Sequence, residues 1–499
     1  MFESAELSHK ISKAVYHREE PKLREALLHA QYNLHENGRF PVLILIAGVE
    51  GAGKGETVNL LNEWMDPRHI YAHAFPEPSD EERERPPMWR FWRALPPKGK
   101  IGVFFGAWHT APIVGRVRGV LGEGEFSQQI GEILRFEKML CDEGVLLLKF
   151  WFHLSKAQQK QRLKALEKDP KTRWRVTDNE WKYFKLYNKF IKVCEPFLRK
   201  TSTGEAPWIV VAGAESRYRS LTVGRYLLAA MRERLDEKPV KGLPDKTPPL
   251  LPAADHLNVL RALTLDQPLT KGDYEKQLER WQGRLNVLSR HPRFKQISVV
   301  MVFEGNDAAG KGGAIRRVTG ALDTRSYHSV PVAAPTEEER AQPYLWRFWR
   351  HIPRHGRFTI FDRSWYGRVL VERVEGFCSE NDWMRAYTEI NDFEQQLVRK
   401  NIAVVKFWLA ISKQEQLRRF KEREKIAFKQ FKITEEDWRN RKKWDAYEQA
   451  VCDMVDRTST MIAPWTLVEA NNKYHARIKV LKTLCQATEA ALERTKSGG

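Results

Sequence analysis

The chain of 499 residues carries the same sequence pattern twice, at a constant offset of 257 residues. The segment LILIAGVEGAGKGET contains Gly48, and the segment VMVFEGNDAAGKGGA contains the matching Gly305. The same offset relates five further pairs: Lys54 and Lys311, Trp89 and Trp346, Trp108 and Trp365, Lys149 and Lys406, and Pro207 and Pro464. A register held over about 160 residues predicts a duplicated domain of about 240 residues.

A proline-rich segment separates the two copies. Residues 237–256 read EKPVKGLPDKTPPLLPAADH and contain five prolines. Proline removes a backbone donor and fixes φ, so this composition is incompatible with a helix or a central strand. We therefore expect an N-terminal domain over 1–236, a linker over 237–256 and a C-terminal domain over 257–499.

Short apolar runs alternate with helical patterns inside each copy. The predicted strands are 42–47, 101–105, 145–151 and 208–212 in the first copy, and 297–303, 358–361, 402–408 and 465–469 in the second. Continuous apolar strands that alternate with amphipathic helices are typical of a parallel sheet buried on both faces. The predicted fold class is therefore α/β, with two tandem parallel-sheet domains.

A glycine-rich loop follows the first predicted strand of the second copy. The segment GNDAAGKGG spans 305–313 and precedes a predicted helix. In this context the backbone N–H groups and the helix N-terminus bind phosphate, and the lysine reaches the bridging and terminal phosphate oxygens. The expected phosphate-binding residues are Gly305, Asn306, Gly310, Lys311, Gly312 and Gly313. The alternative is a plain glycine turn.

The loop lacks the hydroxyl residue that usually binds Mg²⁺, because Gly312 follows Lys311. The metal therefore needs other ligands. Asp307 lies inside the loop, and Asp362 ends the strand FTIF in the position of a Walker B acid. Two carboxylates beside a phosphate loop suit one or two Mg²⁺ ions that bridge the transferred group. For Asp362 the alternative role is a helix cap or a surface turn.

Arginines are concentrated in the second copy, with eight between residues 340 and 373. Guanidinium groups bind phosphate oxygens bidentately and keep their charge. Arg363 and Arg368 follow the Asp362 strand end, so we expect them at the carboxyl edge of the sheet, where α/β ligands bind. Arg347 and Arg350 of the WRFWR element are expected to face the same site.

The overall charge of +20 points to a polyanionic partner, such as nucleic acid, a membrane surface or polyphosphate, or else to a merely basic protein. No apolar run reaches the length of a membrane span, and the opening segment has no apolar signal core. The five scattered cysteines form no C-x-x-C pair, which predicts reduced thiols in the cytoplasm. The basic run from Arg418 is either a mobile lid over the substrate or a solvated helix face.

Three motifs together, GNDAAGKGGAI, WRFWR and FDRSWYGRVLVERVEGF, resemble those of the family-2 polyphosphate kinases. The resemblance covers nearly the whole chain, once in each copy. It implies a thymidylate-kinase-like P-loop fold with a helical lid, and Mg²⁺-dependent phosphoryl transfer between polyphosphate and a nucleotide. The two-copy layout is similar to the subclass described as polyphosphate:AMP phosphotransferases, which make ADP.

The resemblance also implies roles for particular residues. Asp307 and Asp362 are expected to bind the metal, and Lys311 and Arg363 to bind phosphate. Arg368 and Glu372 are expected near the reacting groups. Asp307 is also the carboxylate that we expect to orient the acceptor oxygen.

The first copy departs from this pattern at the strand end that follows the loop. The offset pairs Asp362 with Phe105, Arg363 with Gly106, Arg368 with Ala111 and Glu372 with Gly115. Lys54 and the loop glycines persist, and Glu50 replaces the loop aspartate. We therefore expect the first copy to be catalytically inert and to serve as a pseudo-dimer partner or as an extra surface for the polyanion.

Three alternative functions remain open at this stage. They are a polyphosphate-dependent nucleoside diphosphate kinase, an NTP-dependent nucleoside monophosphate kinase, and a non-catalytic nucleic-acid-binding P-loop protein whose WRFWR elements stack bases. We expect inorganic polyphosphate and AMP or ADP as partners, no nucleic acid and no membrane. The duplication mimics a dimer, and pairing of whole chains is left open.

Overall fold

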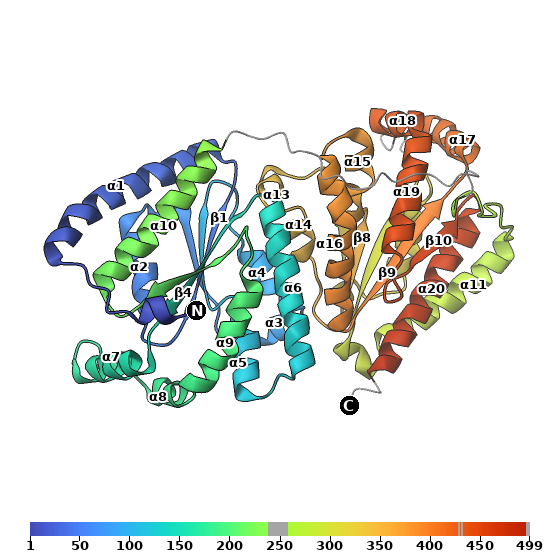
Figure 1. Ribbon diagram of the computed structural model, residues 1–499. Helices are drawn as coiled ribbons and strands as arrows, with labels where there is room; N and C mark the ends of the chain where they lie inside the picture. The colour runs from blue at the N-terminus through green and yellow to red at the C-terminus, as the bar shows by residue number, and fades with distance from the viewer. Residues whose placement is uncertain (238–257, 428–429, 431–432, 496–499) are drawn as a thin grey trace. The chain divides into compact units, whose positions relative to one another are not determined.

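The computed structural model describes residues 1–237, 258–427, 430 and 433–495. These residues form two compact units, and each unit is built around one five-stranded sheet (Figure 1). The predicted linker lies outside the described residues except for Glu237, and so do residues 496–499. The predicted domain boundaries therefore stay predictions.

The sheet of the first unit consists of parallel strands in the order β2-β3-β1-β4-β5. Its strands are β1 (Val42–Gly48), β2 (Ile70–Ala74), β3 (Ile101–Phe105), β4 (Leu146–His153) and β5 (Trp208–Ala212). The second unit repeats this topology, because its parallel strands lie in the order β7-β8-β6-β9-β10. Its strands are β6 (Ser298–Gly305), β7 (Tyr327–Pro331), β8 (Phe358–Asp362), β9 (Ile402–Ala410) and β10 (Trp465–Glu469). The α/β prediction is confirmed.

The sequence did not predict two of the strands, β2 and its counterpart β7. Each lies at the edge of its sheet and pairs with one neighbour only. Most of their side chains are exposed or half-buried. Edge strands need no continuous apolar run, and Pro331 is tolerated at such a position because its missing N–H breaks no central ladder. The prediction of four strands per copy was therefore one strand short.

Helices cover both sheets. In the N-terminal half they are α1 (Lys13–Asn37), α2 (Lys54–Trp64), α3 (Asp80–Arg83), α4 (Trp89–Ala94), α5 (Thr110–Arg118), α6 (Glu123–Asp142), α7 (Lys156–Lys168), α8 (Asp178–Lys185), α9 (Tyr187–Thr201) and α10 (Ser216–Asp236). In the C-terminal half they are α11 (Lys271–Ser289), α12 (Lys311–Thr319), α13 (Glu337–Arg340), α14 (Trp346–Trp349), α15 (Val371–Glu375), α16 (Glu380–Arg399), α17 (Lys413–Glu424), α18 (Glu435–Lys442), α19 (Trp444–Thr458) and α20 (Lys473–Arg494). In Figure 1, α1 lies beside α10, and α11 lies beside α20.

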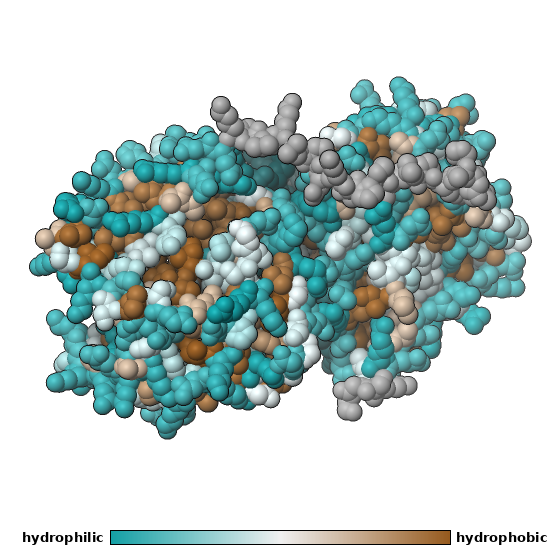
Figure 2. Space-filling model, viewed as in Figure 1, coloured by the Kyte–Doolittle hydropathy of each residue, from teal (hydrophilic) through white to brown (hydrophobic). Residues whose placement is uncertain are grey.

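The core of the second unit fills the space between the sheet and the helices α11, α12 and α20. Val299, Met301 and Phe303 of β6 are fully buried there, with Leu481 and Leu484 of α20. Full burial of such a side chain stabilises the fold by about 1.5–3 kcal/mol. Polar residues cover much of the face that Figure 2 shows (teal). No helix among the described residues is both long enough and apolar enough to cross a membrane.

The lysines of the two KFW segments lie inside the protein. Lys406 of β9 is fully buried, and its Nζ lies 2.7 Å from Oε2 of Glu394 on α16. Lys149 of β4 makes the equivalent ion pair with Glu137 of α6, also at 2.7 Å. Each lysine thus links its sheet to a covering helix. This structural role explains why a lysine occurs at the same position in both copies.

Candidate active site

The predicted phosphate loop, residues 305–313, lies at the carboxyl end of β6, the central strand of the second sheet. β6 pairs with β8 on one side and with β9 on the other, so the loop faces the crevice where α/β proteins bind ligands. Gly305 has φ of 149°, and a Cβ there would lie 2.5 Å from the Leu409 carbonyl oxygen. Only glycine therefore fits at the start of this loop.

Lys311 is the first residue of α12 and is folded back over the loop. Its Nζ donates a hydrogen bond to the Gly305 carbonyl oxygen at 2.8 Å. Gly310, just before it, has φ of 110°, a conformation that glycine adopts without strain. The lysine amine is thus held against the first glycine of the loop, and phosphate binding by the loop stays a prediction.

A large basic cavity of about 770 Å³ opens beside the loop. Basic side chains dominate its described lining: Lys311, Arg316, Arg363, Arg419, Arg423, Lys425, Lys473 and Arg477. Asp362 and Glu422 are the acidic residues in the same lining. Such an excess of positive charge in one concave site favours a polyanion over a single small anion.

A smaller cavity of about 90 Å³ lies next to the basic cavity, and we call it the acceptor cavity. Aromatic and aliphatic residues form much of its wall: Leu370, Val371, Trp408, Trp444 and Tyr447. Asp307 and Asn440 add polar groups. Lys311 and Arg363 line both cavities, so their side chains lie where the two spaces meet.

Arg363 adopts an unusual backbone conformation at this junction. Its φ is 64°, and its N–H donates to the Phe303 carbonyl oxygen at 3.0 Å. The side chain lies near two carboxylates, with Nη2 at 3.6 Å from Asp307 Oδ1 and Nη1 at 3.9 Å from Glu436 Oε1. A non-glycine residue in this region costs about 1 kcal/mol, a strain that is concentrated at functional sites.

The two predicted metal ligands differ in their surroundings. Asp307 accepts a hydrogen bond from Asn440 Nδ2 at 3.0 Å in addition to its Arg363 contact, and it lines the acceptor cavity. Asp362 ends β8 and lines the basic cavity. Among the described residues, no group of three His, Cys, Asp or Glu side chains could hold a metal by itself. Mg²⁺ usually takes one or two carboxylates and completes its shell with water and substrate phosphates, and Asp362 fits that pattern.

Glu304 is a site residue that the sequence analysis missed. It is 6% exposed, lines the acceptor cavity and accepts a hydrogen bond from Ser364 Oγ at 2.8 Å. Burial raises the pKa of this carboxyl group, although Lys311 and Arg363 oppose the shift. The signal was one acidic residue inside the apolar run VMVFEG, directly before the first loop glycine.

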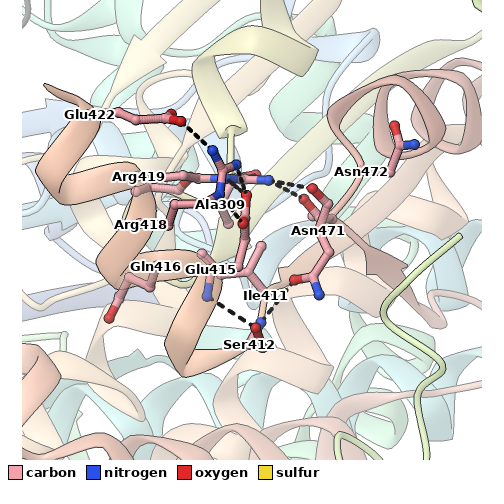
Figure 3. A network of polar contacts seen from close by, with 12 residues as sticks. Ala309, Ile411, Ser412, Glu415, Gln416, Arg418, Arg419, Glu422, Asn471 and Asn472 are labelled. Atoms are coloured by element: carbon pink, nitrogen blue, oxygen red, sulfur yellow. Dashed lines mark hydrogen bonds and ion pairs between the residues drawn. The ribbon is translucent and has the colours of Figure 1, made fainter. Parts of the chain in front are cut away.

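Arg419, the second residue of the predicted lid run, is 2% exposed and holds the phosphate loop in place (Figure 3). Its Nη1 donates to the carbonyl oxygens of Ala308 at 2.9 Å and Ala309 at 3.0 Å. Its Nη2 donates to those of Ala470 at 2.6 Å and Asn471 at 2.8 Å. The Nε atom lies 2.5 Å from Glu415. This arginine ties the loop to the end of β10, so it is neither a lid residue nor part of a solvated face.

The rest of the basic run has mixed surroundings. Arg423 and Lys425 line the basic cavity, which agrees with a position over the substrate. Residues 428–429 and 431–432 of the run lie outside the described residues. A lid movement stays a prediction.

Four further residues that the sequence placed in the site lie outside the described lining of both cavities. Arg368 pairs with Glu372 at 2.9 Å, next to Leu370 and Val371 of the acceptor cavity. The Nη2 atom of Arg347 donates to the carbonyl oxygen of Ala333 in the wall of the basic cavity, and Arg350 is exposed. Their predicted roles stay predictions.

In the first unit, the basic side chains at the equivalent loop pair with acidic side chains of the same unit. Lys54 Nζ lies 3.0 Å from Glu50 and 2.8 Å from the Gly48 carbonyl oxygen. Glu56 stands where the second unit has Gly313, and it pairs with Arg162 at 2.7 Å and with Arg219 at 2.5 Å. The cations beside this loop therefore already have carboxylate partners within the protein, although Glu56 is shared by more than one arginine.

Known proteins resemble the chain over nearly its whole length. The polyphosphate:AMP phosphotransferases of Pseudomonas aeruginosa and Pseudomonas syringae pv. tomato are 61% and 57% identical to it, each over 99% of this chain and 100% of the relative. A crystal structure titled as a polyphosphate kinase 2 from Pseudomonas aeruginosa PA01 matches with a TM-score of 0.89 at 60% identity, over 99% of both chains.

The sequence pattern that defines polyphosphate kinase 2 occurs twice, over residues 10–239 and 268–496. The two matches coincide with the two sheets of identical topology. The chain therefore belongs to the polyphosphate kinase 2 family, and the predicted family is confirmed.

Proposed function

We propose that this protein transfers the terminal phosphoryl group of inorganic polyphosphate to AMP, giving ADP, and that its second unit performs the reaction. The observation that carries the proposal is the meeting of two different cavities at Lys311 and Arg363. The larger one is basic enough for a polyanion, and the smaller one is lined by aromatic rings and polar groups. Relatives that align over the full length are named for this activity.

In this proposal polyphosphate lies in the basic cavity, with its terminal phosphate at the N-terminus of α12. Arg316, Arg423 and Arg477 neutralise the chain, because guanidinium groups bind phosphate oxygens with two parallel hydrogen bonds. The AMP base packs against Trp444 and Tyr447 of the acceptor cavity. The AMP phosphate then faces the terminal phosphorus at the junction of the two cavities.

The reaction exchanges one P–O bond for another. An oxygen of the AMP phosphate attacks the terminal phosphorus in line, and the bond from that phosphorus to the bridging oxygen breaks. The bridging electron pair leaves with the shortened polyphosphate, which the basic cavity stabilises. The attacking oxygen is already ionised at neutral pH, so no general base is required.

Lys311 and Arg363 neutralise the charge of the transferred group, which lies between the two cavities. Fixed charges of this kind act without reorganisation and are among the largest contributions to catalysis. Mg²⁺, when bound at Asp362 and the phosphates, supplies further positive charge to the transferred group. Asp307, held by Asn440, orients the acceptor through its contact with Arg363.

The direct test incubates the purified full-length protein with AMP, long-chain polyphosphate and Mg²⁺, without ATP. We expect rapid ADP formation that stops when EDTA is added. ADP formed only with ATP as the donor would replace this proposal with a nucleoside monophosphate kinase. An equal or faster reaction with ADP as the acceptor would replace AMP by a nucleoside diphosphate.

We also propose that the protein works in the cytoplasm. The cysteines among the described residues are all free thiols, and three of the five are buried. Free thiols persist in a reducing compartment. Fusion of the chain to a fluorescent protein would test this location, and fluorescence confined to the cell envelope would contradict it.

A further inference from the structure

The first unit has a cavity of its own at the carboxyl end of its sheet. The cavity has a volume of about 240 Å³, and it reaches the loop that follows β1. Its wall is mainly apolar and aromatic and includes Phe105, Ile113, Val117, Trp151, Tyr187 and Phe190. We call it the first-unit cavity.

This cavity is the counterpart of the acceptor cavity in the second unit. At the offset of 257 residues, Glu304 becomes Ala47, Arg363 becomes Gly106, Asn440 becomes Tyr183 and Tyr447 becomes Phe190. At these four positions the polar groups of the acceptor cavity are thus replaced by small or aromatic ones, whereas Lys311 and Gln416 keep the same residue types in Lys54 and Gln159. The space itself persists and is larger, at about 240 Å³ against about 90 Å³.

The charged groups near the first-unit cavity have partners within the protein. Lys54 is paired with Glu50, so the two charges cancel. Arg118 is exposed, and its Nη2 donates to the Tyr183 hydroxyl at 2.8 Å. Arg162 and Arg219 are held by Glu56, whose carboxylate occupies the position of a loop glycine in the second unit. The described lining of the first-unit cavity includes one lysine and one arginine, Lys54 and Arg118, against eight lysines and arginines in the basic cavity, so a highly charged phosphate chain meets no comparable set of cations here.

Two buried residues of the wall each have a polar side-chain atom without a hydrogen-bond partner among the described residues. Gln159 is 3% exposed and donates to the Glu50 carbonyl oxygen, while its own Oε1 accepts no hydrogen bond from the described residues. Trp151 is 1% exposed, and its Nε1 donates to none of them. Polar atoms buried without a partner are rare in native proteins and call for an explanation. The Gln159 oxygen can accept a hydrogen bond and the Trp151 N–H can donate one. A heteroaromatic ring that carries both a donor and an acceptor would match these two atoms.

We propose that the first-unit cavity binds a flat, uncharged heteroaromatic molecule of nucleoside size and does not bind polyphosphate. The aromatic wall stacks on the ring, and filling an apolar cavity restores the contacts that its lining otherwise lacks. The first-unit cavity is larger than the acceptor cavity, in which we propose that the AMP base packs, so it has room for a ring system of this size. The proposal does not depend on which unit performs phosphoryl transfer.

Adenosine is the probe for this proposal, and the acceptor cavity must first be blocked, because it can also take a nucleoside. Val371→Trp fills the acceptor cavity of the full-length protein. Titration calorimetry of this variant should detect one equivalent of adenosine, and an excess of tripolyphosphate should not displace it. Absence of adenosine binding to this variant at millimolar concentration would overturn the proposal.

The matched change in the first unit is Val114→Trp, because Val114 is the counterpart of Val371 and lines the first-unit cavity. Added to Val371→Trp, it should weaken adenosine binding more than tenfold. Circular dichroism shows whether this double variant is folded, and Thr110→Phe at an exposed lining position replaces it if it is not. Adenosine binding that survives both Val114→Trp and Thr110→Phe in folded protein would contradict the assignment.

Discussion

Glu56 of the first unit holds Arg219 in an ion pair, with 2.5 Å between the Oε2 and Nη2 atoms. Arg219 lies so close to the loop that a Cβ on Gly53 would be 2.2 Å from its guanidinium carbon. In the second unit the position of Glu56 is taken by Gly313, which lines the basic cavity. In the first unit, the carboxylate of Glu56 therefore provides the negative charge beside the loop. In the second unit, we propose that bound polyphosphate provides it.

Asp362→Asn tests the proposed metal ligand. The change keeps the shape of the side chain at the end of β8 but removes its charge from the basic cavity. We expect turnover to fall by about 10²–10³-fold, as for the loss of one preorganised charged group. The Mg²⁺ concentration for half-maximal rate should rise, and the melting temperature should change little. Initial rates over a Mg²⁺ titration test this, and unchanged rates would exclude the role.

Arg419→Lys tests the tie between the phosphate loop and β10. A lysine cannot reach the five acceptors of the guanidinium, so buried carbonyl oxygens lose their donors. We expect a loss of at least about 3 kcal/mol in the free energy of unfolding, together with lower turnover. Its counterpart Arg162 is 37% exposed, and Arg162→Lys should cost less than about 1 kcal/mol. Equal losses in urea unfolding of the two variants would contradict this account.

Glu304→Gln tests the buried carboxyl group. Burial raises its pKa in the folded protein above the ordinary value of 4.5. The folded state therefore binds the proton more tightly than the unfolded state, so this group stabilises the fold at low pH and its contribution is lost as the pH rises through the folded pKa. Relative to the unchanged protein, Glu304→Gln should gain stability between pH 4.5 and neutral pH. Thermal unfolding across this range measures the difference, and a difference independent of pH would contradict the shift.

Lys406→Met tests the ion pair between β9 and α16. The change leaves the Glu394 carboxyl group buried without its cation, which typically costs about 3–5 kcal/mol. Replacing both partners by apolar residues, Lys406→Met with Glu394→Leu, should recover part of the loss, because no uncompensated charge then remains. Urea unfolding followed by circular dichroism measures both variants. If Lys406→Met alone were as stable as the unchanged protein, the ion pair would make no contribution to the stability of the fold.

The repeat, four of the five strands of each sheet and the glycine-rich loop could be predicted because each has a local signal. The offset of 257 residues needs no structure, and the loop glycines report a backbone shape that only glycine permits. Asp362 was predicted from its place after an apolar strand, and the structure places it in the wall of the basic cavity.

Arg419 and Glu304 could not be identified in this way, because their surroundings come from distant segments. Arg419 lies in a run whose sequence indicates a mobile lid or a solvated helix face, yet its acceptors include the carbonyl oxygens of residues 470 and 471. Glu304 has its partner in Ser364, 60 residues further along the chain. The edge strands β2 and β7 were missed for another reason, since their segments IYAHA and YHSVP contain no continuous apolar run and most of their side chains are not buried.

The most direct test of the account compares Lys311→Ala with Lys54→Ala in the full-length protein. The measurement is the initial rate of ADP formation from AMP and long-chain polyphosphate with Mg²⁺. The account predicts that Lys311→Ala lowers the rate by about 10²-fold or more, whereas Lys54→Ala, whose charge is already paired with Glu50, keeps most of it. A comparable loss in both variants, or a loss in Lys54→Ala alone, would contradict the claim that the second unit performs the reaction.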